Sequence, residues 1–426
     1  MPASPSTARA INDRLALRLL QQQGPLTAGQ LKQLTGLSRP TVADLVERLT
    51  AAGLITVVGE AGEQRRGPNA RLYGIVADRA HLAALDVRTG GVFVLVSDLV
   101  GRVLAEASVP IGGDTGTGPA VEQAVATVER TAKEAGADRL HTVGIGAPGL
   151  VDPATGDLRD SGGLPAWHRS LAAALQERLS GARVTVENET NLAALAEQRE
   201  GAARDRETFV LLWLGHGVGA AVVLDGTLRR GASGGTGEIG FLPVPGTTSL
   251  PSAGDCDGGF HSLAGAAAIG ALAADCGLPV PAAMDGPGAA EVLRAAVAEL
   301  AGQESGSAAV PAGEPGTPRP EEESAAGTVP PKAARPAGRF LHALADRIAL
   351  GAASVVAVLD PGCVVLGGEA GQAGGAVLAG LVQDRLRRMS PLLTEVRAST
   401  LGGAAVLRGA LLTARDRAQE ELFARP

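Results

Sequence analysis

The sequence predicts an α/β protein, in which a winged helix-turn-helix domain at the N-terminus precedes a larger body of strands and helices. Two patterns indicate this fold class. Within residues 11–53, apolar side chains recur at helical spacing between glycine turns, and two short β-type runs follow. From residue 81 onward, strand-like apolar runs alternate with glycine turns and helical stretches. A chain of 426 residues is long enough for two or three hydrophobic cores.

The N-terminal segment has the apolar spacing of successive helices. A helix is predicted at residues 11–23, with one face formed by Ile11, Leu15, Leu19 and Leu20. A short helix at residues 28–35 follows, capped by Thr27. The next helix is predicted to begin after an N-cap at Ser38, with Pro40 in its first turn. Its buried stripe has i, i+3, i+4, i+7 spacing and consists of Val42, Leu45, Val46 and Leu49.

This order of helices is typical of a helix-turn-helix domain, although an ordinary three-helix bundle is the alternative. A β-hairpin predicted from residues 54–58 and 71–76 favours the first interpretation, because it would form a wing. The hairpin loop contains Arg65 and Arg66. Arginines on a wing suit contact with DNA phosphates or with the minor groove.

The second helix of the motif carries the candidate base contacts. Ser38, Arg39 and Thr41 are expected at its exposed N-terminal end, facing base edges. An arginine that binds guanine with two hydrogen bonds contributes about 1–3 kcal/mol of discrimination. Arg48 lies nearer the C-terminal end, so we expect it to contact the DNA backbone, with a plain solvated surface role as the equal alternative.

Charge is distributed unevenly along the chain. Residues 1–75 carry nine Lys and Arg against five Asp and Glu, whereas the remainder carries 29 against 40. A basic end on an acidic body indicates a polyanionic partner for the first domain only. We therefore assign residues 1–77 to a DNA-binding domain whose partner is double-stranded operator DNA.

The sequence also predicts where the protein resides. Three cysteines cannot form a paired disulfide framework, which indicates a reducing compartment. The N-terminus has no apolar signal core. The most apolar run, residues 348–359, is shorter than the about 20 residues that a bilayer requires, so we expect a buried helix that leads to a strand. These observations predict a cytoplasmic protein without a membrane partner.

Residues 211–241 organise the body. They are predicted to form a strand, a glycine turn, a strand, a hairpin turn at Asp225 and Gly226, a strand, and a second glycine loop that ends in Glu238. Together with residues 186–197 and 364–368, this stretch resembles the ROK family of bacterial sugar kinases and sugar-responsive repressors. The resemblance covers most of residues 80–415, and the added N-terminal domain makes the chain similar to xylose-operon-type repressors. It implies a two-lobed, actin-like sugar-kinase fold for residues 78–426.

The resemblance also implies a sugar site, in which Asn188, Glu189 and Glu238 match family ligands. Other ligands of the family are missing, because Phe241 replaces a histidine and Ser262 stands near the position of a glutamate. The segment at residues 163–167 lacks the family's asparagine.

The phosphate-transfer machinery departs from the kinase pattern. Where family kinases have Asp-x-Gly-Gly-Thr, this chain has Asp86-Val87-Arg88-Thr89-Gly90, so side chains replace both glycines. Glu189 replaces the aspartate that acts as general base, which moves the carboxylate by about an ångström. A second phosphate loop is retained at residues 215–217, with His216 in place of a small hydroxyl residue. We therefore expect no catalysis and no cofactor.

The zinc site of the family is also expected to be absent. The family's cysteine cluster corresponds to residues 255–261, which contain Cys256 and His261. One cysteine cannot supply the sulfur-rich tetrahedral site that structural zinc prefers, although His261 and two aspartates remain an alternative ligand set. Without metal, Phe241 and Phe260 are the candidates to fill the space. Further along, residues 303–336 are rich in Pro, Gly, Ala, Glu and Ser, which predicts a disordered insertion.

These observations favour a DNA-binding transcriptional regulator, and specifically a repressor, with a catalytically degraded and zinc-free body. It would act as a homodimer or homotetramer and respond to a sugar or sugar phosphate that closes the two lobes. The alternative is an active ATP-dependent sugar kinase with an appended DNA-binding domain. A further alternative is a regulator whose body only dimerises and binds no sugar.

Overall fold

The computed structural model describes residues 5–61, 70–159, 164–252, 254, 257–306 and 335–424. The chain forms two compact units. The first comprises Met1–Leu192 and Val406–Pro426, and the second comprises Ala193–Ala405. The chain therefore passes from the first unit to the second within helix α6 (Glu189–Glu200), and it returns at the start of helix α12 (Ala405–Phe423).

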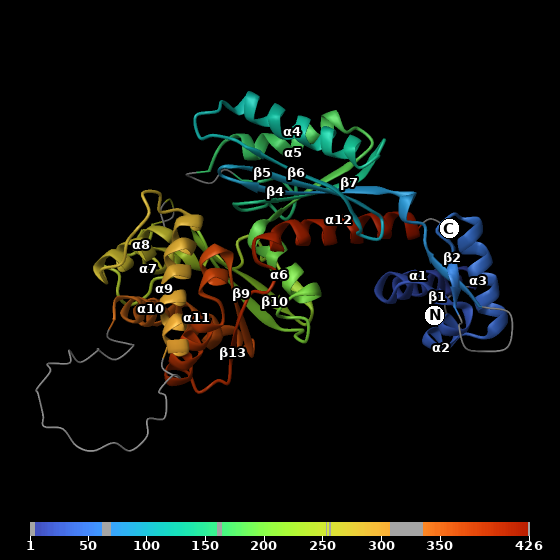
Figure 1. Cartoon of the computed structure of the whole chain (residues 1–426). Helices are drawn as coiled ribbons and strands as arrows, with labels where there is room; N and C mark the ends of the chain where they lie inside the picture. The colour runs from blue at the N-terminus through green and yellow to red at the C-terminus, as the bar shows by residue number, and fades with distance from the viewer. Residues whose placement is uncertain are drawn as a thin grey trace, which may run out of the picture. The chain divides into compact units, whose positions relative to one another are not determined.

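The N-terminal part of the first unit is a winged helix-turn-helix domain (Figure 1). Its helices are α1 (Pro5–Gln23), α2 (Ala28–Thr35) and α3 (Arg39–Ala51). Its sheet has the order β1-β3-β2, with β1 (Leu26–Thr27), β2 (Ile55–Ala61) and β3 (Ala70–Ile75). The predicted helix caps are confirmed, since Thr27 caps α2 and Ser38 caps α3. The predicted stripe of α3 is buried, whereas the short strand β1 was not predicted.

The predicted face of α1 is wrong in part. Ile11 and Leu15 are 56% and 38% exposed, and the buried positions of the helix are Asp13, Ala16, Leu17 and Leu20. The buried stripe keeps the i, i+3, i+4, i+7 spacing but includes a small residue and a carboxylate. An aspartate is tolerated there because Arg48 of α3 pairs with it.

The rest of the first unit is an α/β lobe. A short helix, η1 (Ala77–Arg79), connects it to the winged domain. Its sheet has the order β6-β5-β4-β7-β8, in which β4, β5 and β6 are antiparallel neighbours while β7 and β8 run parallel to β4. The elements are β4 (His81–Arg88), β5 (Gly91–Asp98), β6 (Val103–Pro110), α4 (Thr117–Glu134), β7 (Leu140–Ala147), α5 (Trp167–Arg178) and β8 (Arg183–Asn188). These elements confirm the alternation of strands, turns and helices that the sequence predicted from residue 81 onward.

Helices cover both faces of this sheet (Figure 1). Apolar side chains of α4 and α5 form one core with alternate residues of the strands. On the opposite face, α12 packs against β7 so closely that a Cβ atom added to Gly144 would lie 2.5 Å from the carbonyl oxygen of Ala410. A Cβ atom on Gly146 would lie 2.5 Å from Val406. Glycines in β7 therefore permit this contact.

The second unit repeats the strand order of the first lobe. Its sheet has the order β11-β10-β9-β12-β13, with β9, β10 and β11 antiparallel and β12 and β13 parallel to β9. The hairpin turn is confirmed, because Asp225 and Gly226 have φ angles of 53° and 70°. The strands are β9 (Phe209–Leu214), β10 (Val218–Leu224), β11 (Thr227–Arg229), β12 (Cys363–Gly367) and β13 (Glu395–Ala398). The helices are η2 (Ile239–Phe241), α7 (His261–Ala264), α8 (Ala266–Asp275), α9 (Gly286–Gly306), α10 (Pro336–Leu359), α11 (Gly368–Met389) and η4 (Gly402–Ala404).

Helix α10 contains the most apolar run of the sequence. The run begins within a helix of 24 residues that, among the described residues, is long and apolar enough to cross a membrane. The prediction that this apolar segment is too short to span a bilayer is therefore wrong for the helix as a whole. Its burial in the protein, and not its length, identifies it as a core helix. Half of its apolar window is buried, and Phe340, Leu344 and Ile348 lie fully buried in the core of the second unit. As predicted, this helix leads to a buried strand, β12.

The insertion predicted at residues 303–336 falls largely on residues 307–334, which lie outside the described residues. Its first residues, 303–306, belong to helix α9, and Pro336 begins α10. The predicted boundaries were therefore too wide at both ends. Glutamine and glutamate are good helix formers, so α9 continues past the last apolar position.

Candidate functional site

The N-terminal end of α3 presents the predicted base contacts. The Ser38 hydroxyl accepts a hydrogen bond from the backbone N–H of Thr41 at 3.3 Å and lies 2.8 Å from the Thr41 hydroxyl. Between them, the Arg39 side chain is exposed. No ion pair of Arg39 is present among the described residues. The three residues therefore share one helical turn, and Arg39 is available for an external partner.

Arg48 has a different environment. Its Nη2 lies 2.6 Å from Oδ1 of Asp13 on α1, and its Nη1 pairs with Asp44 one turn earlier on α3. The hydrogen bond to Asp13 is the main cause that raises the Arg48 pKa. The predicted DNA-backbone contact of Arg48 stays a prediction, and it would compete with two carboxylates. Arg65 and Arg66, predicted on the wing, lie outside the described residues.

Asn188, a predicted sugar ligand, caps helix α6. Its Oδ1 accepts hydrogen bonds from the backbone N–H groups of Thr190 at 2.8 Å and Asn191 at 3.2 Å. Its Nδ2 donates to the Gly149 carbonyl and to Oε2 of Glu189, both at 3.0 Å. Asn188 and Glu189 thus lie together, as predicted, but the amide of Asn188 is already engaged by the protein. A sugar hydroxyl would have to share or displace these bonds.

Glu238, the other predicted sugar ligand, belongs to the second unit and directly precedes η2. Burial of its surroundings raises the pKa of the Glu238 carboxyl. The residue as a whole is nevertheless exposed to solvent. Because the side chain is open to solvent, its carboxyl oxygens are accessible to a ligand hydroxyl.

A charged pair marks the end of β4 in the first unit. Asp86 is 2% exposed, and its Oδ2 accepts hydrogen bonds from Nε and Nη2 of Arg88 at 2.8 and 2.6 Å. The Arg88 guanidinium also lies 4.5 Å from the centre of the Phe93 ring. Burial raises the pKa of Asp86, and the charge of Arg88 opposes that rise. A protein cation therefore sits permanently beside this carboxylate.

His168 is a buried polar residue that the sequence did not point to. It is 4% exposed, in the first turn of α5, with its ring 4.3 Å from the Trp167 ring in an edge-to-face arrangement. Burial lowers the pKa of His168 to about 4, and the Arg88 backbone opposes this shift. Among the described residues, neither ring nitrogen has a partner at hydrogen-bonding geometry, so the contact with the Arg88 backbone is a weak one. His168 is neutral at pH 7.

A second unanticipated residue lies beside the glycine loop at residues 215–217. Within that loop the Gly215 N–H donates to the Gly217 carbonyl at 3.0 Å, and His216 is exposed. Glu369 stands in the first turn of α11. A Cβ atom on Gly215 would lie 2.5 Å from Oε2 of Glu369, and one on Gly286 would lie 2.9 Å from its carboxyl carbon. This Oε2 is buried without a hydrogen-bond partner among the described residues.

Comparison with known proteins identifies the family. A model of the ROK family matches residues 84–417, and a model of the MarR family matches residues 11–67. The chain belongs to the ROK family. Its N-terminal winged helix-turn-helix is of the MarR type, and the ROK fold follows it.

The chain is similar to regulators within the ROK family. It is 28% identical to the DNA-binding transcriptional dual regulator NagC of Escherichia coli (strain K12), over 55% of this chain and 58% of NagC. It is 25% identical to a xylose repressor of Caldicellulosiruptor bescii, over 55% of this chain and 59% of that repressor. These alignments span less than two thirds of either relative. The crystal structure of a ROK family transcriptional regulator, described as a homologue of the E. coli MLC protein, has a TM-score of 0.71 at 21% identity and covers 98% of both chains, which shows the fold.

The segment predicted to correspond to the family's zinc cluster is only partly described. Asp255 and Cys256 lie outside the described residues, so the predicted absence of zinc stays a prediction. Among the described residues, no cluster of three or more His, Cys, Asp or Glu side chains could hold a metal. Phe260 is fully buried in the core of the second unit, and its role as a substitute for zinc stays a prediction. The expectation for Phe241 is wrong, because its side chain is 39% exposed and fills no buried space.

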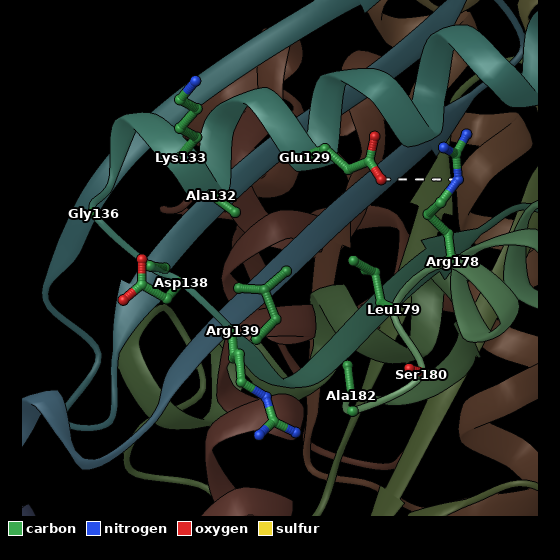
Figure 2. Close-up of a pocket in the computed structure, with 13 residues that line it drawn as sticks. Glu129, Ala132, Lys133, Gly136, Asp138, Arg139, Arg178, Leu179, Ser180 and Ala182 are labelled. Carbon is green, nitrogen blue, oxygen red and sulfur yellow. Dashed lines mark ion pairs between the residues drawn. The ribbon is translucent and has the colours of Figure 1, made fainter.

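The first unit also contains a cavity of about 580 Å³, lined by the C-terminal ends of α4 and α5 (Figure 2). These helix ends lead into the N-terminal ends of β7 and β8, whereas Asp86 and Asn188 lie at carboxyl ends of strands of the same sheet. Ligands of open α/β sheets bind outside the carboxyl ends. Arg178 of the cavity is paired with Glu129 at 3.8 Å. We therefore place the candidate site at the carboxyl ends and not in this cavity.

Proposed function

We propose that this ROK family protein is a DNA-binding transcriptional regulator that represses its target, and that its ROK body senses a sugar or sugar phosphate without phosphorylating it. One observation carries the proposal: a winged helix-turn-helix precedes a ROK body, and at the start of α3 it exposes Arg39, which has no ion pair within the described part of the chain. Its similarity to NagC and to a xylose repressor supports the proposal.

In this proposal α3 enters the major groove. Arg39 would read a guanine, while the hydroxyls of Ser38 and Thr41 contact neighbouring base edges or phosphates. Arg48, Arg65 and Arg66 would contact the DNA backbone. Two half-sites on operator DNA require two recognition helices, so we propose a homodimer or homotetramer. The cytoplasm is the compartment that such a regulator requires.

We propose the absence of phosphoryl transfer from the charged side chains that lie near the two segments corresponding to the family's phosphate loops. Phosphoryl transfer requires space for phosphates and a metal ion that bridges them. In this chain the Arg88 guanidinium already neutralises Asp86, and the Glu369 carboxylate lies against the glycine loop at residues 215–217. Both side chains oppose a nucleotide by occupying space, and Glu369 also opposes it by charge. Glu189 in place of an aspartate adds to this argument.

The effector is proposed from the retained polar residues. Asn188, Glu189 and Glu238 would each bind sugar hydroxyls, and binding of the ligand would change DNA affinity. Such an effect requires different ligand affinities in the two states. N-acetylglucosamine and xylose are the first sugars to test, because relatives are named for them.

A binding titration tests the proposal. The full chain is titrated onto DNA from its own upstream region and onto random DNA at near-physiological salt, with and without N-acetylglucosamine, xylose and their phosphates. Preference for its own DNA that one sugar abolishes is the expected result. Preference that no sugar alters would support a body that only dimerises. Equal binding to both DNAs, together with sugar-dependent release of ADP from ATP, would instead establish the kinase.

A further inference from the structure

The turn between β5 and β6 holds the winged domain against the α/β lobe. Gln419 of α12 donates one amide hydrogen to Oε1 of Gln21 on α1 at 2.7 Å and the other to the Leu99 carbonyl at 3.1 Å. The amide of Gln21 donates in turn to the Val100 carbonyl at 3.4 Å. The same turn also binds the connecting segment, because the Leu99 N–H donates to the Ala77 carbonyl at 2.9 Å.

Burial makes this bridge costly to break. Gln419 is 9% exposed and Leu99 is fully buried. Removing one partner of a buried hydrogen bond leaves the other unsatisfied, which costs more than the bond itself contributes. Arg415, one turn earlier on α12, packs against Gly101, where an added Cβ atom would lie 3.1 Å from its Nη1. Helix α12 therefore fixes α1 at a defined position on the lobe.

The other end of α12 is anchored where the chain crosses between units. The segment before α12 is tied to Glu197 of α6, a carboxylate that is fully buried. Its oxygens accept hydrogen bonds from Ser399 Oγ at 2.5 Å and from the N–H groups of Thr400 and Leu401 at 3.2 Å. Within the second unit, the segment that leads into α12 is thus tied to α6.

On the side of the first unit, the two crossing helices touch directly. A Cβ atom on Gly409 would lie 2.0 Å from the Leu192 carbonyl oxygen, so only glycine permits this approach of α12 to α6. Helix α6 begins immediately after its cap, Asn188, and its first residue is Glu189. A ligand at these two residues would contact the N-terminus of α6, and α6 contacts α12.

At the DNA-binding end, the contacts continue from α1 to α3. The ion pair of 2.6 Å between Asp13 and Arg48 joins α1 to the recognition helix. Gln21 and Asp13 lie on the same helix, eight residues or about 12 Å apart. An unbroken series of packed helices therefore leads from the crossing between the units to α3.

We propose that helix α12 transmits rearrangement at the crossing between the two units to the recognition helix, and that Gln419 is the positioning residue through which it holds α1. From Ala405 to Gln419 the helix spans about 21 Å, and a packed helix moves as a rigid body over that length. The proposal rests on the proposed function, because it takes α3 as the DNA-reading element. It adds the route by which the body would control that element.

Hydrogen–deuterium exchange of the full chain tests the docking step. In Gln419→Ala, we expect amides of residues 15–23 and 97–103 to exchange about tenfold faster, as loss of a buried hydrogen-bonded bridge implies. Gln21→Ala removes the half-buried partner with less disturbance of α12 and should give the same pattern. The matched control is Gln23→Ala, an exposed glutamine on the same helix. Unchanged exchange in both Gln419→Ala and Gln21→Ala would overturn the proposal.

Ser399→Ala tests whether α12 transmits the rearrangement to α1. The substitution removes one hydrogen-bond donor to Glu197 and leaves the carboxylate in place. Faster exchange at residues 399–404 together with residues 15–23 is expected. Faster exchange at 399–404 alone, or no change at either segment, would refute transmission. These readouts need no DNA, so they stand even if the chain prefers no DNA and the proposed function fails. If it does prefer its own DNA, Gln419→Ala should weaken that binding about tenfold and leave random-DNA binding unchanged.

Discussion

Replacing Glu369 by alanine should stabilise the second unit, although the change removes a charge and several side-chain atoms. Oε2 of Glu369 is buried and has no hydrogen-bond partner among the described residues. An unsatisfied buried polar group costs about 1–3 kcal/mol, and more if it is charged. Gly215 and Gly286 both lie close to this carboxylate, since a Cβ atom added to either glycine would clash with it. Removing the unsatisfied carboxylate therefore contributes favourably to the free energy of unfolding.

Two stabilising contributions of the Glu369 side chain are lost in the substitution and oppose this gain in stability. A carboxylate in the first turn of α11 gains about 0.3–1 kcal/mol from the helix dipole. The deleted methylene contributes about 0.8 kcal/mol of burial. Because the carboxylate is charged, its cost lies at the upper end of that range, about 3 kcal/mol. We therefore expect a net gain of about 1 kcal/mol in the free energy of unfolding, which corresponds to about 2–4 °C in the melting temperature of a unit of this size.

Calorimetry of the full chain measures this effect, with Glu299→Ala, an exposed glutamate on α9, as the matched control. The control should melt within about 1 °C of the wild type, as surface substitutions usually do. A lower melting temperature for Glu369→Ala would refute the reasoning, because it would mean that the carboxylate is satisfied in solution. The same variant should bind a fluorescent ATP analogue more tightly than the wild type, because the glycine loop is then free of negative charge.

Further predictions concern the winged domain and His168. Arg39→Ala should lose about tenfold in discrimination at one base pair of its DNA, measured by titrating base-substituted sites; equal loss on random DNA would make Arg39 a phosphate contact. A double-mutant cycle of Asp13→Ala and Arg48→Ala should show a coupling of about 1 kcal/mol in thermal unfolding, since the pair is partly exposed, and no coupling would exclude it as the link between α1 and α3. The pKa of His168 falls from 6.5 to about 4 on folding, so the unfolded chain binds the extra proton between these values. Stability should therefore rise with pH across this window by up to about 1.4 kcal/mol per unit, and His168→Gln should flatten that part of the pH profile; an unchanged profile would contradict the assigned burial.

Local sequence patterns predicted most elements of the fold. Helix caps at Thr27 and Ser38, the hairpin turn at Asp225 and Gly226, and the strands of the first lobe depend on neighbours a few residues away. Such features are set by backbone preferences and short-range hydrogen bonds, which the sequence displays directly. The repeated strand order of the two units came from resemblance to the ROK family, because periodicity does not specify which strands pair.

The candidate site was predictable only in part. The sequence named Asn188 and Glu238, but it did not show that the amide of Asn188 caps α6 or that the two residues fall in different units. His168 and Glu369 gave no signal, since a single histidine or glutamate is ordinary in any helix. Their significance arises from burial without partners, which depends on the packing around them.

The sequence by itself determined the class of protein and the helix-turn-helix that carries Arg39. Tertiary structure alone decided which face of α1 is buried, because Asp13 can be buried only when Arg48, distant in sequence, pairs with it. It also decided that Gln21 and Gln419, at opposite ends of the chain, meet beside Leu99. Contacts between distant segments depend on how whole elements pack, and no local pattern encodes that geometry.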